Sequence, residues 1–270
     1  EQPARYVVVS CGAIESARLL LNSRSRLHPQ GLGNRFDWVG RNLQGHTYTG
    51  ANGLFDEIAY DDLGPGASIA ICDFNHGNPG LAGGAMLANE FIRLPYQFVS
   101  GIRDPDVPRW GRAHKEFVRR AYRRIIPVQG PTQEIPVFDS RVSLDARVRD
   151  RFGIPVARIS GYRHPHTLEI SEAMAERAAE WLRASGAVKV WLRRAGRGVS
   201  GGQHQAGTCR MGKDPKTSVV DPWCRVHDTD NVYVVDASVH VTNGGFNPVL
   251  TIMALAYRSG AHLAREGRRA

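Results

Sequence analysis

The sequence has little cysteine and no long hydrophobic run. Its four cysteines are too few and too scattered for a disulfide scaffold, and no pair has zinc-finger spacing. We therefore expect buried or free thiols at Cys11, Cys72, Cys209 and Cys224, and no metal site. No apolar run approaches the length of a membrane-spanning helix, and no secretory signal is present.

The sequence also lacks the signatures of nucleic-acid binding. Its net charge is +9, yet the basic residues are dispersed except for short clusters at 119–124 and 265–269. No zinc-finger spacing or aromatic and basic RNA motif accompanies them, so we expect no nucleic-acid partner. Hydrophobic residues make up 42% and charged residues 23% of the chain, as in ordinary soluble globular proteins. The compartment stays open between cytoplasm and periplasm.

The chain opens with an apolar run, Tyr6–Val9, which is followed by a turn at Cys11-Gly12-Ala13 and a helical pattern to residue 23. An uninterrupted β-branched run predicts a strand that is buried on both faces, as in a parallel α/β sheet. Because the sequence begins without Met and enters a strand at once, we interpret it as the C-terminal part of a longer protein.

The middle of the chain predicts an inserted α+β region. Residues 24–46 form a loop and short turn, and 47–140 mix short β-prone pieces with a basic helix near 112–124. Two strands within 141–160 predict an antiparallel sheet, and an amphipathic helix follows over 166–185, ending at Gly186. Strands at 188–192 and 231–236 and a helix from Pro248 to about residue 264 complete the pattern.

Two glycine motifs lie in unsuitable surroundings. Gly196-x-Gly198-x-x-Gly201 matches the dinucleotide fingerprint, but the residues after Gly201 do not start a helix that could receive a pyrophosphate. Gly198-Val-Ser200-Gly-Gly202 matches the nucleophile elbow of α/β hydrolases, which also needs a helix directly after the serine. Asp and His residues follow in the order that hydrolases use, so a serine hydrolase acting through Ser200 stays open as an alternative.

Two polar segments near the end of the chain are better candidates. His204 lies between glycines, at 201, 202 and 207, that let the backbone approach a planar ligand, and an imidazole is suited to general base catalysis near neutral pH. Asn247 precedes Pro248 and the last helix, whose first turn presents free N–H groups and partial positive charge. Asp236, at the end of a predicted buried strand, is placed where open α/β sheets bind ligands.

These motifs together resemble the C-terminal half of a glucose–methanol–choline (GMC) flavin oxidoreductase. The resemblance covers nearly the whole chain and is carried by Gly12-Ala-Ile-Glu-Ser-Ala-Arg-Leu-Leu-Leu21, Val39-Gly-Arg-Asn-Leu-Gln-Gly-His46, Arg141-Val-Ser-Leu-Asp145, His204-Gln-Ala-Gly-Thr-Cys-Arg-Met-Gly212, Asp230–Ser238 and Asn247-Pro-Val-Leu-Thr251. Ala17 departs from the family's usual proline, and Gln205 from the frequent proline after the histidine. The strand–GxGxxG–helix unit that holds FAD in the family is absent from this chain.

The resemblance implies a Rossmann-like FAD-binding domain, made here of 1–46 and 219–270, interrupted by an α+β substrate domain at 47–218 with an antiparallel sheet. It implies oxidation of an alcohol, sugar or polyol with FAD. His204 would be the base, Asn247 would bind the substrate oxygen, and Gly12, Ala13, Asp236, Ala237, Asn247, Pro248 and Val249 would contact the cofactor. The implied partners are the missing N-terminal FAD-binding portion and, in some relatives, an electron-acceptor subunit. A truncated relative that cannot hold FAD is the first alternative.

Overall fold

The computed structural model describes residues 2–61, 66–90, 93–200 and 202–269, which divide into two compact units. Unit 1 comprises 1–46, 133–165 and 197–270, and unit 2 comprises 47–132 and 166–196. The first division falls at His46, where the predicted first segment ends, whereas 133–165 and 197–218 lie in unit 1. The assignment of a cofactor domain and a substrate domain stays a prediction.

Unit 1 begins with the predicted strand, turn and helix. Strand β1 (Val7–Val9) pairs in parallel with β9 (Val232–Val234), and α1 (Gly12–Asn22) follows β1 directly. Gly12 has a φ of +79°, which only glycine adopts at little cost. The parallel pairing expected from the apolar runs is confirmed, and Asp236 follows β9 as expected.

The prediction that the first strand is buried on both faces is wrong for this chain. Val7 and Val8 are 43% and 53% exposed, and only Val9 is buried. The partner strand β9 in the same two-stranded sheet is largely buried, so the exposure of Val7 and Val8 reflects how little of the described chain packs over their side chains.

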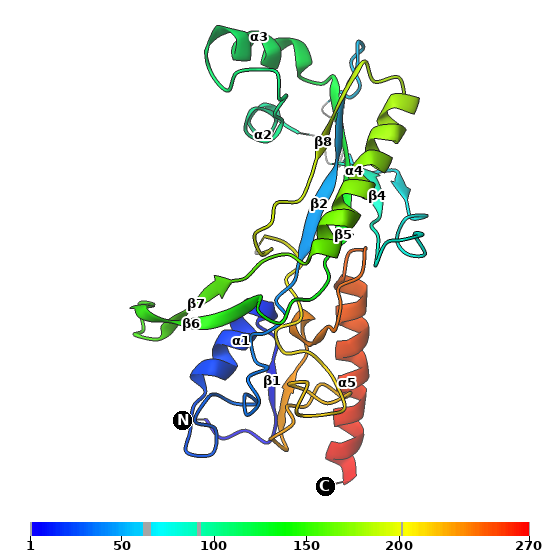
Figure 1. Cartoon of the computed structure of the whole chain (residues 1–270). Helices are drawn as coiled ribbons and strands as arrows, with labels where there is room; N and C mark the ends of the chain where they lie inside the picture. The colour runs from blue at the N-terminus through cyan, green and yellow to red at the C-terminus, as the bar shows by residue number, and fades with distance from the viewer. Residues whose placement is uncertain (1, 62–65, 91–92, 201, 270) are drawn as a thin grey trace. The chain divides into compact units, whose positions relative to one another are not determined.

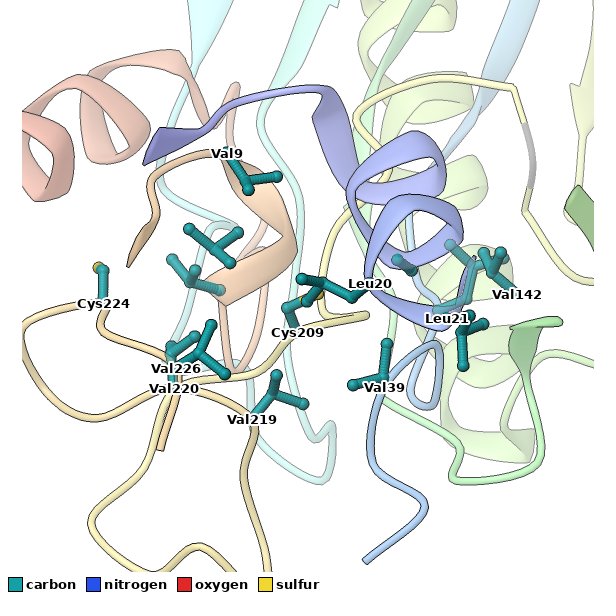
Figure 2. Packing of buried hydrophobic residues seen from close by; sticks show 14 residues of the cluster. Val9, Leu20, Leu21, Val39, Val142, Cys209, Val219, Val220, Cys224 and Val226 are labelled. Atoms are coloured by element: carbon teal, nitrogen blue, oxygen red, sulfur yellow. The ribbon is translucent and has the colours of Figure 1, made fainter. Parts of the chain in front are cut away.

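The core of unit 1 lies between α1 and the loops that precede and follow β9 (Figure 2). Leu20 and Leu21 of α1 point into it because the helix has an apolar face at 3.6-residue spacing. Valines and two cysteine thiols from later segments fill the remaining space, among them Val39, Val142, Cys209, Val219, Val220, Cys224 and Val226. Cys11 and Cys72 are exposed, and all four cysteines are free thiols, as predicted.

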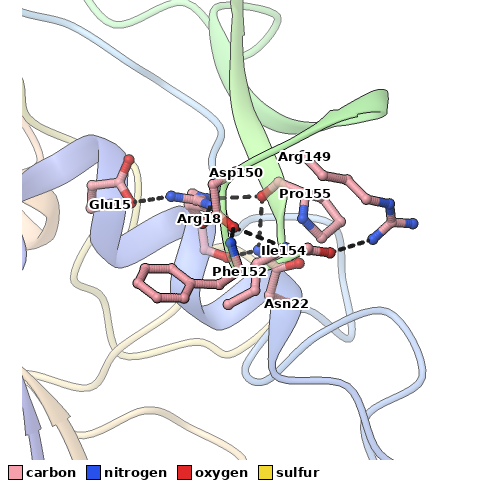
Figure 3. A network of polar contacts seen from close by, with 9 residues as sticks. Glu15, Arg18, Asn22, Arg149, Asp150, Phe152, Ile154 and Pro155 are labelled. Carbon is pink, nitrogen blue, oxygen red and sulfur yellow. Dashed lines mark hydrogen bonds and ion pairs between the residues drawn. The ribbon is translucent and has the colours of Figure 1, made fainter.

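A β-hairpin packs on α1 in the same unit. Strands β6 (Arg141–Arg149) and β7 (Pro155–Ser160) pair antiparallel, as the sequence predicts. Arg18 of α1 donates to the Asp150 carboxylate at 2.7 Å and to the Pro155 carbonyl at 2.8 Å (Figure 3). These bonds hold the turn end of the hairpin to the helix. The hydrogen bonds of Arg18 to Asp150 and to Glu15 raise the pKa of its guanidinium.

Unit 2 is built on a five-stranded sheet in the order β3-β4-β5-β2-β8. Its strands are β2 (His46–Leu54), β3 (Ala70–Ile71), β4 (Leu87–Asn89), β5 (Ile125–Gln133) and β8 (Lys189–Arg193). The pairs β2–β8, β3–β4 and β4–β5 are antiparallel. Unit 2 therefore contains the antiparallel sheet expected of an α+β region.

Three helices accompany this sheet: α2 (Pro95–Gly101), α3 (Gly111–Ala121) and α4 (Pro165–Ala184). The predicted helices near 112–124 and over 166–185 are confirmed. The helix α3 ends about three residues early because Ile125 begins β5. Gly186 has a φ of +90° just after α4, which is the conformation that ends helices at glycine.

The last helix, α5 (Val249–Arg269), is labelled in Figure 1 and belongs to unit 1. It begins directly after Pro248, as predicted. Proline suits this place because the first helical residues have no intrahelical acceptor for their N–H groups. Within the described part of the chain, we find no helix whose length and apolar character would allow it to cross a membrane.

Candidate functional site

His204 lies in an irregular segment of unit 1 that is paired with the residues before β2. Gln44 and Ala206 form an antiparallel bridge, with the Gln44 N–H donating to the Ala206 carbonyl at 3.2 Å and the reverse bond at 2.8 Å. The His46 N–H donates to the Gln203 carbonyl at 3.1 Å. Segments 44–46 and 203–206 therefore run side by side, although about 160 residues separate them.

The imidazoles of His204 and His46 are in direct contact. Their Nδ1 atoms are 2.8 Å apart, and the rings meet edge to face with centroids 5.0 Å apart. The Nε2 of His46 lies 2.9 Å from the Gly244 carbonyl oxygen. His204 was predicted as a site residue and His46 was not, although His46 ends the motif that begins at Val39.

A buried amide holds the backbone of His204. Asn243 donates from Nδ2 to the His204 carbonyl at 2.6 Å, and its own N–H donates to the Gln44 side chain at 3.1 Å. His204 has a φ of +53°, a left-handed conformation that is uncommon outside glycine and is often found at functional sites. Asn243 has no local signal in the sequence, whereas Asn247 is marked by the proline and the helix that follow it.

His240 lies beside this amide and is buried. Its side chain is 5% exposed and its Nδ1 lies 3.1 Å from Asn243 Oδ1. The Nε2 of His240 is buried and has no hydrogen-bond partner among the described residues. The sequence gives no signal for this position, because a single histidine in an irregular segment does not show which side chains surround it.

Burial keeps the two paired histidines neutral. Desolvation is the largest effect on His46, which lies 3% exposed, and lowers its pKa to about 4, with a smaller repulsion from His204 in the same direction. Burial also lowers the pKa of the half-buried His204. Both imidazoles are therefore uncharged near neutral pH, which is the form that accepts a proton.

The pKa of His46 predicts a loss of stability at low pH. The unfolded chain binds a proton at this imidazole near pH 6.5, whereas the folded chain does so only near pH 4, so acid favours unfolding between these values. Wild type should lose about 2–3 kcal/mol more unfolding free energy than His46→Asn between pH 7.5 and 4.5, at about 1.4 kcal/mol per pKa unit. Urea unfolding at both pH values measures this. Equal losses would show that His46 is not held neutral.

Asp236 accepts hydrogen bonds from the first turns of α1. Its Oδ2 accepts from Ser16 Oγ at 2.5 Å and from the Gly12 N–H at 3.1 Å, and its Oδ1 accepts from the Ser238 N–H at 2.8 Å. Asp236 and Ala237 are each 8% exposed, and Ala13 is 3% exposed. Three of the residues predicted to contact a cofactor therefore lie close together, since Asp236 accepts from Gly12 and directly precedes Ala237 in the chain.

Thr208 adds Ala13 to the same cluster. Its Oγ1 donates to the Ala13 carbonyl at 2.5 Å, and the neighbouring Gly207 N–H donates to the Ala237 carbonyl at 3.2 Å. The segment that carries His204 therefore contacts, through Gly207 and Thr208, the start of α1 and the residues just after β9. These contacts place the residues that follow His204 against Ala13 and Ala237, two of the residues predicted to contact a cofactor.

Asn247, Pro248 and Val249 form the entry to α5. Asn247 and Val249 are exposed, whereas Pro248 is buried. The Ile252 N–H donates to the Pro248 carbonyl at 3.0 Å, so the N–H groups of residues 249–251 precede the first intrahelical bond. His204 contacts His46 and Asn243, among others. The predicted convergence of His204 and Asn247 stays a prediction.

Ser200 is not placed as a hydrolase nucleophile would be. Its side chain is 4% exposed, and its Oγ donates to the His46 carbonyl at 3.5 Å. The described residues 202–206 that follow it are not helical, whereas an elbow serine stands exposed at the start of a helix. Gly201, the last glycine of the dinucleotide pattern, lies outside the described residues.

Comparison with known proteins agrees with the resemblance seen in the sequence. Residues 136–256 match the family model described as GMC oxidoreductase. The chain is 36% identical over 267 residues to 6'''-hydroxyparomomycin C oxidase of Streptomyces lividus, covering 97% of this chain and 45% of that protein. It is 31% identical over 284 residues to 2-methyl-1,2-propanediol dehydrogenase of Mycolicibacterium austroafricanum, covering 97% and 48%. The chain thus spans about half the length of these relatives.

The fold is also that of solved oxidases. The chain superposes on a formate oxidase of Aspergillus oryzae, studied for its FAD modification, with a TM-score of 0.63 and 16% identity, covering 98% of this chain and 55% of that one. Its fold is similar to that of pyridoxine 4-oxidase from Mesorbium loti, with a TM-score of 0.57 and 20% identity, covering 98% and 52%. The family model and the relatives place residues 136–256 in the GMC oxidoreductase family, and the solved structures show that the chain has the fold of about half of such an oxidase.

Proposed function

We propose that this chain is the catalytic portion of an FAD-dependent oxidoreductase that oxidises the CH–OH group of an alcohol, sugar or polyol. The observation that carries the proposal is the part-buried contact between His204 and His46, in a chain that matches the GMC family model. The names of the two relatives above, one an oxidase of a hydroxyl-bearing compound and one a diol dehydrogenase, support this substrate class.

The residues fit an FAD group at the entry to α5. Asn247 and Val249 are exposed there, so an amide and the free N–H groups of the first turn are available to a ligand. The buried Nε2 of His240, which lacks a partner among the described residues, is a polar atom that a bound group could satisfy. The carboxylate of Asp236 is less suited to direct contact, because it already accepts three hydrogen bonds.

In this proposal His204 removes the hydroxyl proton of the substrate while the hydroxyl-bearing carbon becomes a carbonyl. FAD, when bound, accepts the hydride that leaves that carbon. Asn247 donates its amide hydrogen to the substrate oxygen and keeps it oriented towards the base. The first turn of α5 supplies positive electrostatic potential, which stabilises negative charge that develops next to it.

Anaerobic titration tests the proposal. The protein, loaded with FAD, should lose its oxidised-flavin absorbance when an oxidisable member of a panel of alcohols, sugars and polyols is added. Failure to retain FAD even when the portion with the strand–GxGxxG–helix unit is present would favour a truncated, non-catalytic relative. Retained flavin that no member of the panel bleaches would count against the reaction itself. Covalent labelling of Ser200 by an active-site serine probe would favour a hydrolase.

The partners of such an enzyme form part of the proposal. One is the portion that carries the strand–GxGxxG–helix unit, since the chain spans about half of its relatives and lacks this unit. A separate electron-acceptor subunit is the other, because a further relative, 23% identical, is named the large subunit of fructose dehydrogenase. Purification of the native protein with its bound partners would identify both.

A further inference from the structure

The contacts of the two paired histidines determine where their hydrogens lie. A carbonyl oxygen can only accept, so the His46 Nε2, which lies 2.9 Å from the Gly244 oxygen, must carry a hydrogen. A neutral imidazole has one N–H, so the His46 Nδ1 is then an acceptor. The facing Nδ1 of His204, 2.8 Å away, must therefore be the donor. The remaining nitrogen of neutral His204, its Nε2, then has the lone pair.

The reversed arrangement does not satisfy both contacts. If His46 donated from Nδ1, its neutral form would turn the lone pair of Nε2 towards the lone pairs of the Gly244 oxygen. A doubly protonated His46 would avoid this, but burial lowers the pKa of its imidazole to about 4. One arrangement of hydrogens therefore fits both contacts near neutral pH.

We propose that His46 is a positioning residue that sets the tautomer of His204 and so makes the His204 Nε2 the proton acceptor. We call this chain of hydrogen bonds the relay. In it the Gly244 carbonyl accepts from the His46 Nε2, the His46 Nδ1 accepts from the His204 Nδ1, and the His204 Nε2 keeps its lone pair. The inference deepens the proposed function, and its catalytic meaning rests on that function. The relay itself is a property of the folded chain.

The backbone around the relay keeps both rings in place. His46 is anchored through its N–H to the Gln203 carbonyl, and the His204 carbonyl accepts from Asn243 Nδ2. The near-perpendicular packing of the rings, with an interplanar angle of 87°, points the Nδ1 edge of one at the other. Because the orienting partner of a histidine sets which nitrogen acts as base, such a fixed contact has chemical consequences.

Nitrogen-15 NMR of histidine-labelled protein tests the relay without any cofactor or substrate. In the folded 270-residue chain at neutral pH, His204 should show a protonated Nδ1 and an unprotonated Nε2, and His46 the opposite pattern. A His204 that carries its hydrogen on Nε2, or a His46 that carries it on Nδ1, would overturn the proposal. The wild-type spectrum alone can therefore decide against it.

Three variants separate the relay from a merely structural role. In His46→Leu, the Nδ1 acceptor is lost and His204 should no longer hold its hydrogen predominantly on Nδ1. In His46→Asn, the side-chain oxygen occupies the position of Nδ1 and should keep the wild-type tautomer. As a matched control, His227→Leu removes another half-buried histidine, one bonded to Ser218 at 2.8 Å, and should leave the His204 signals unchanged.

The outcomes distinguish this inference from the proposed function. An unchanged His204 tautomer in folded His46→Leu contradicts the relay, whatever the enzyme oxidises. A confirmed tautomer together with flavin that no alcohol bleaches contradicts the proposed function and leaves the relay intact. If His46→Leu does not fold, the wild-type and His46→Asn spectra still provide the decisive comparison.

Discussion

Replacement of His204 by alanine should slow the reduction of bound flavin by an alcohol about 10²–10⁴-fold, the usual effect of removing a general base. Burial keeps the imidazole of His204 neutral by lowering its pKa, so at neutral pH it is ready to take the hydroxyl proton. Without it the proton must pass to water while the hydride leaves. Stopped-flow measurement of the loss of oxidised-flavin absorbance, under anaerobic conditions and saturating substrate, gives the rate.

Two further variants control for the backbone and for general perturbation. His204 has a left-handed φ, which asparagine tolerates better than alanine, so His204→Asn keeps the turn while removing the base and should be equally slow. His227→Ala removes a half-buried histidine outside the site and should react at the wild-type rate. Imidazole added to the alanine variant should restore part of the rate. Reduction of His204→Ala at the wild-type rate, with flavin bound, would remove this residue from the mechanism.

The elements that could be predicted are those whose signals are local. The helix α4 has an apolar stripe at helical spacing and a glycine stop, and α5 begins at a proline, so both are bounded by residues near them in sequence. The strands β1 and β9 are recognisable as apolar runs. The exposure of Val7 and Val8 in β1 is not recognisable, because the burial of a side chain depends on which segments pack over it.

Only part of the candidate site could be predicted, because only some of its residues are marked by their neighbours in sequence. Glycines on both sides of His204 mark it locally, whereas the role of His46 depends on a contact across 158 residues. His46 ends a motif that the resemblance had already selected, which is the one signal that could have found it. The five-stranded order of unit 2 has no such signal, since two of its strands have only two and three residues.

A substitution at Gly40 should destabilise unit 1 more than any single change at its surface. Gly40 has a φ of +88°, and a Cβ built on it would lie 2.1 Å from the carbonyl oxygen of Val142. Its N–H donates to the Thr208 carbonyl at 2.7 Å and its carbonyl accepts from the Val142 N–H at 2.9 Å. The glycine is therefore held between β6 and the segment that continues from His204, with no room for a methyl group.

Gly40→Ala should lower the free energy of unfolding by about 3 kcal/mol or more. Left-handed backbone costs an alanine about 1–2 kcal/mol, and overpacking against a backbone atom adds about 1–3 kcal/mol because neither carbonyl nor strand can turn away. Gly153→Ala is the matched control, since its φ is +78° and no atom lies within 4 Å of its Cβ; it should show the backbone cost alone. Urea unfolding followed by circular dichroism measures both, and equal losses would mean that β6 gives way to the added methyl group.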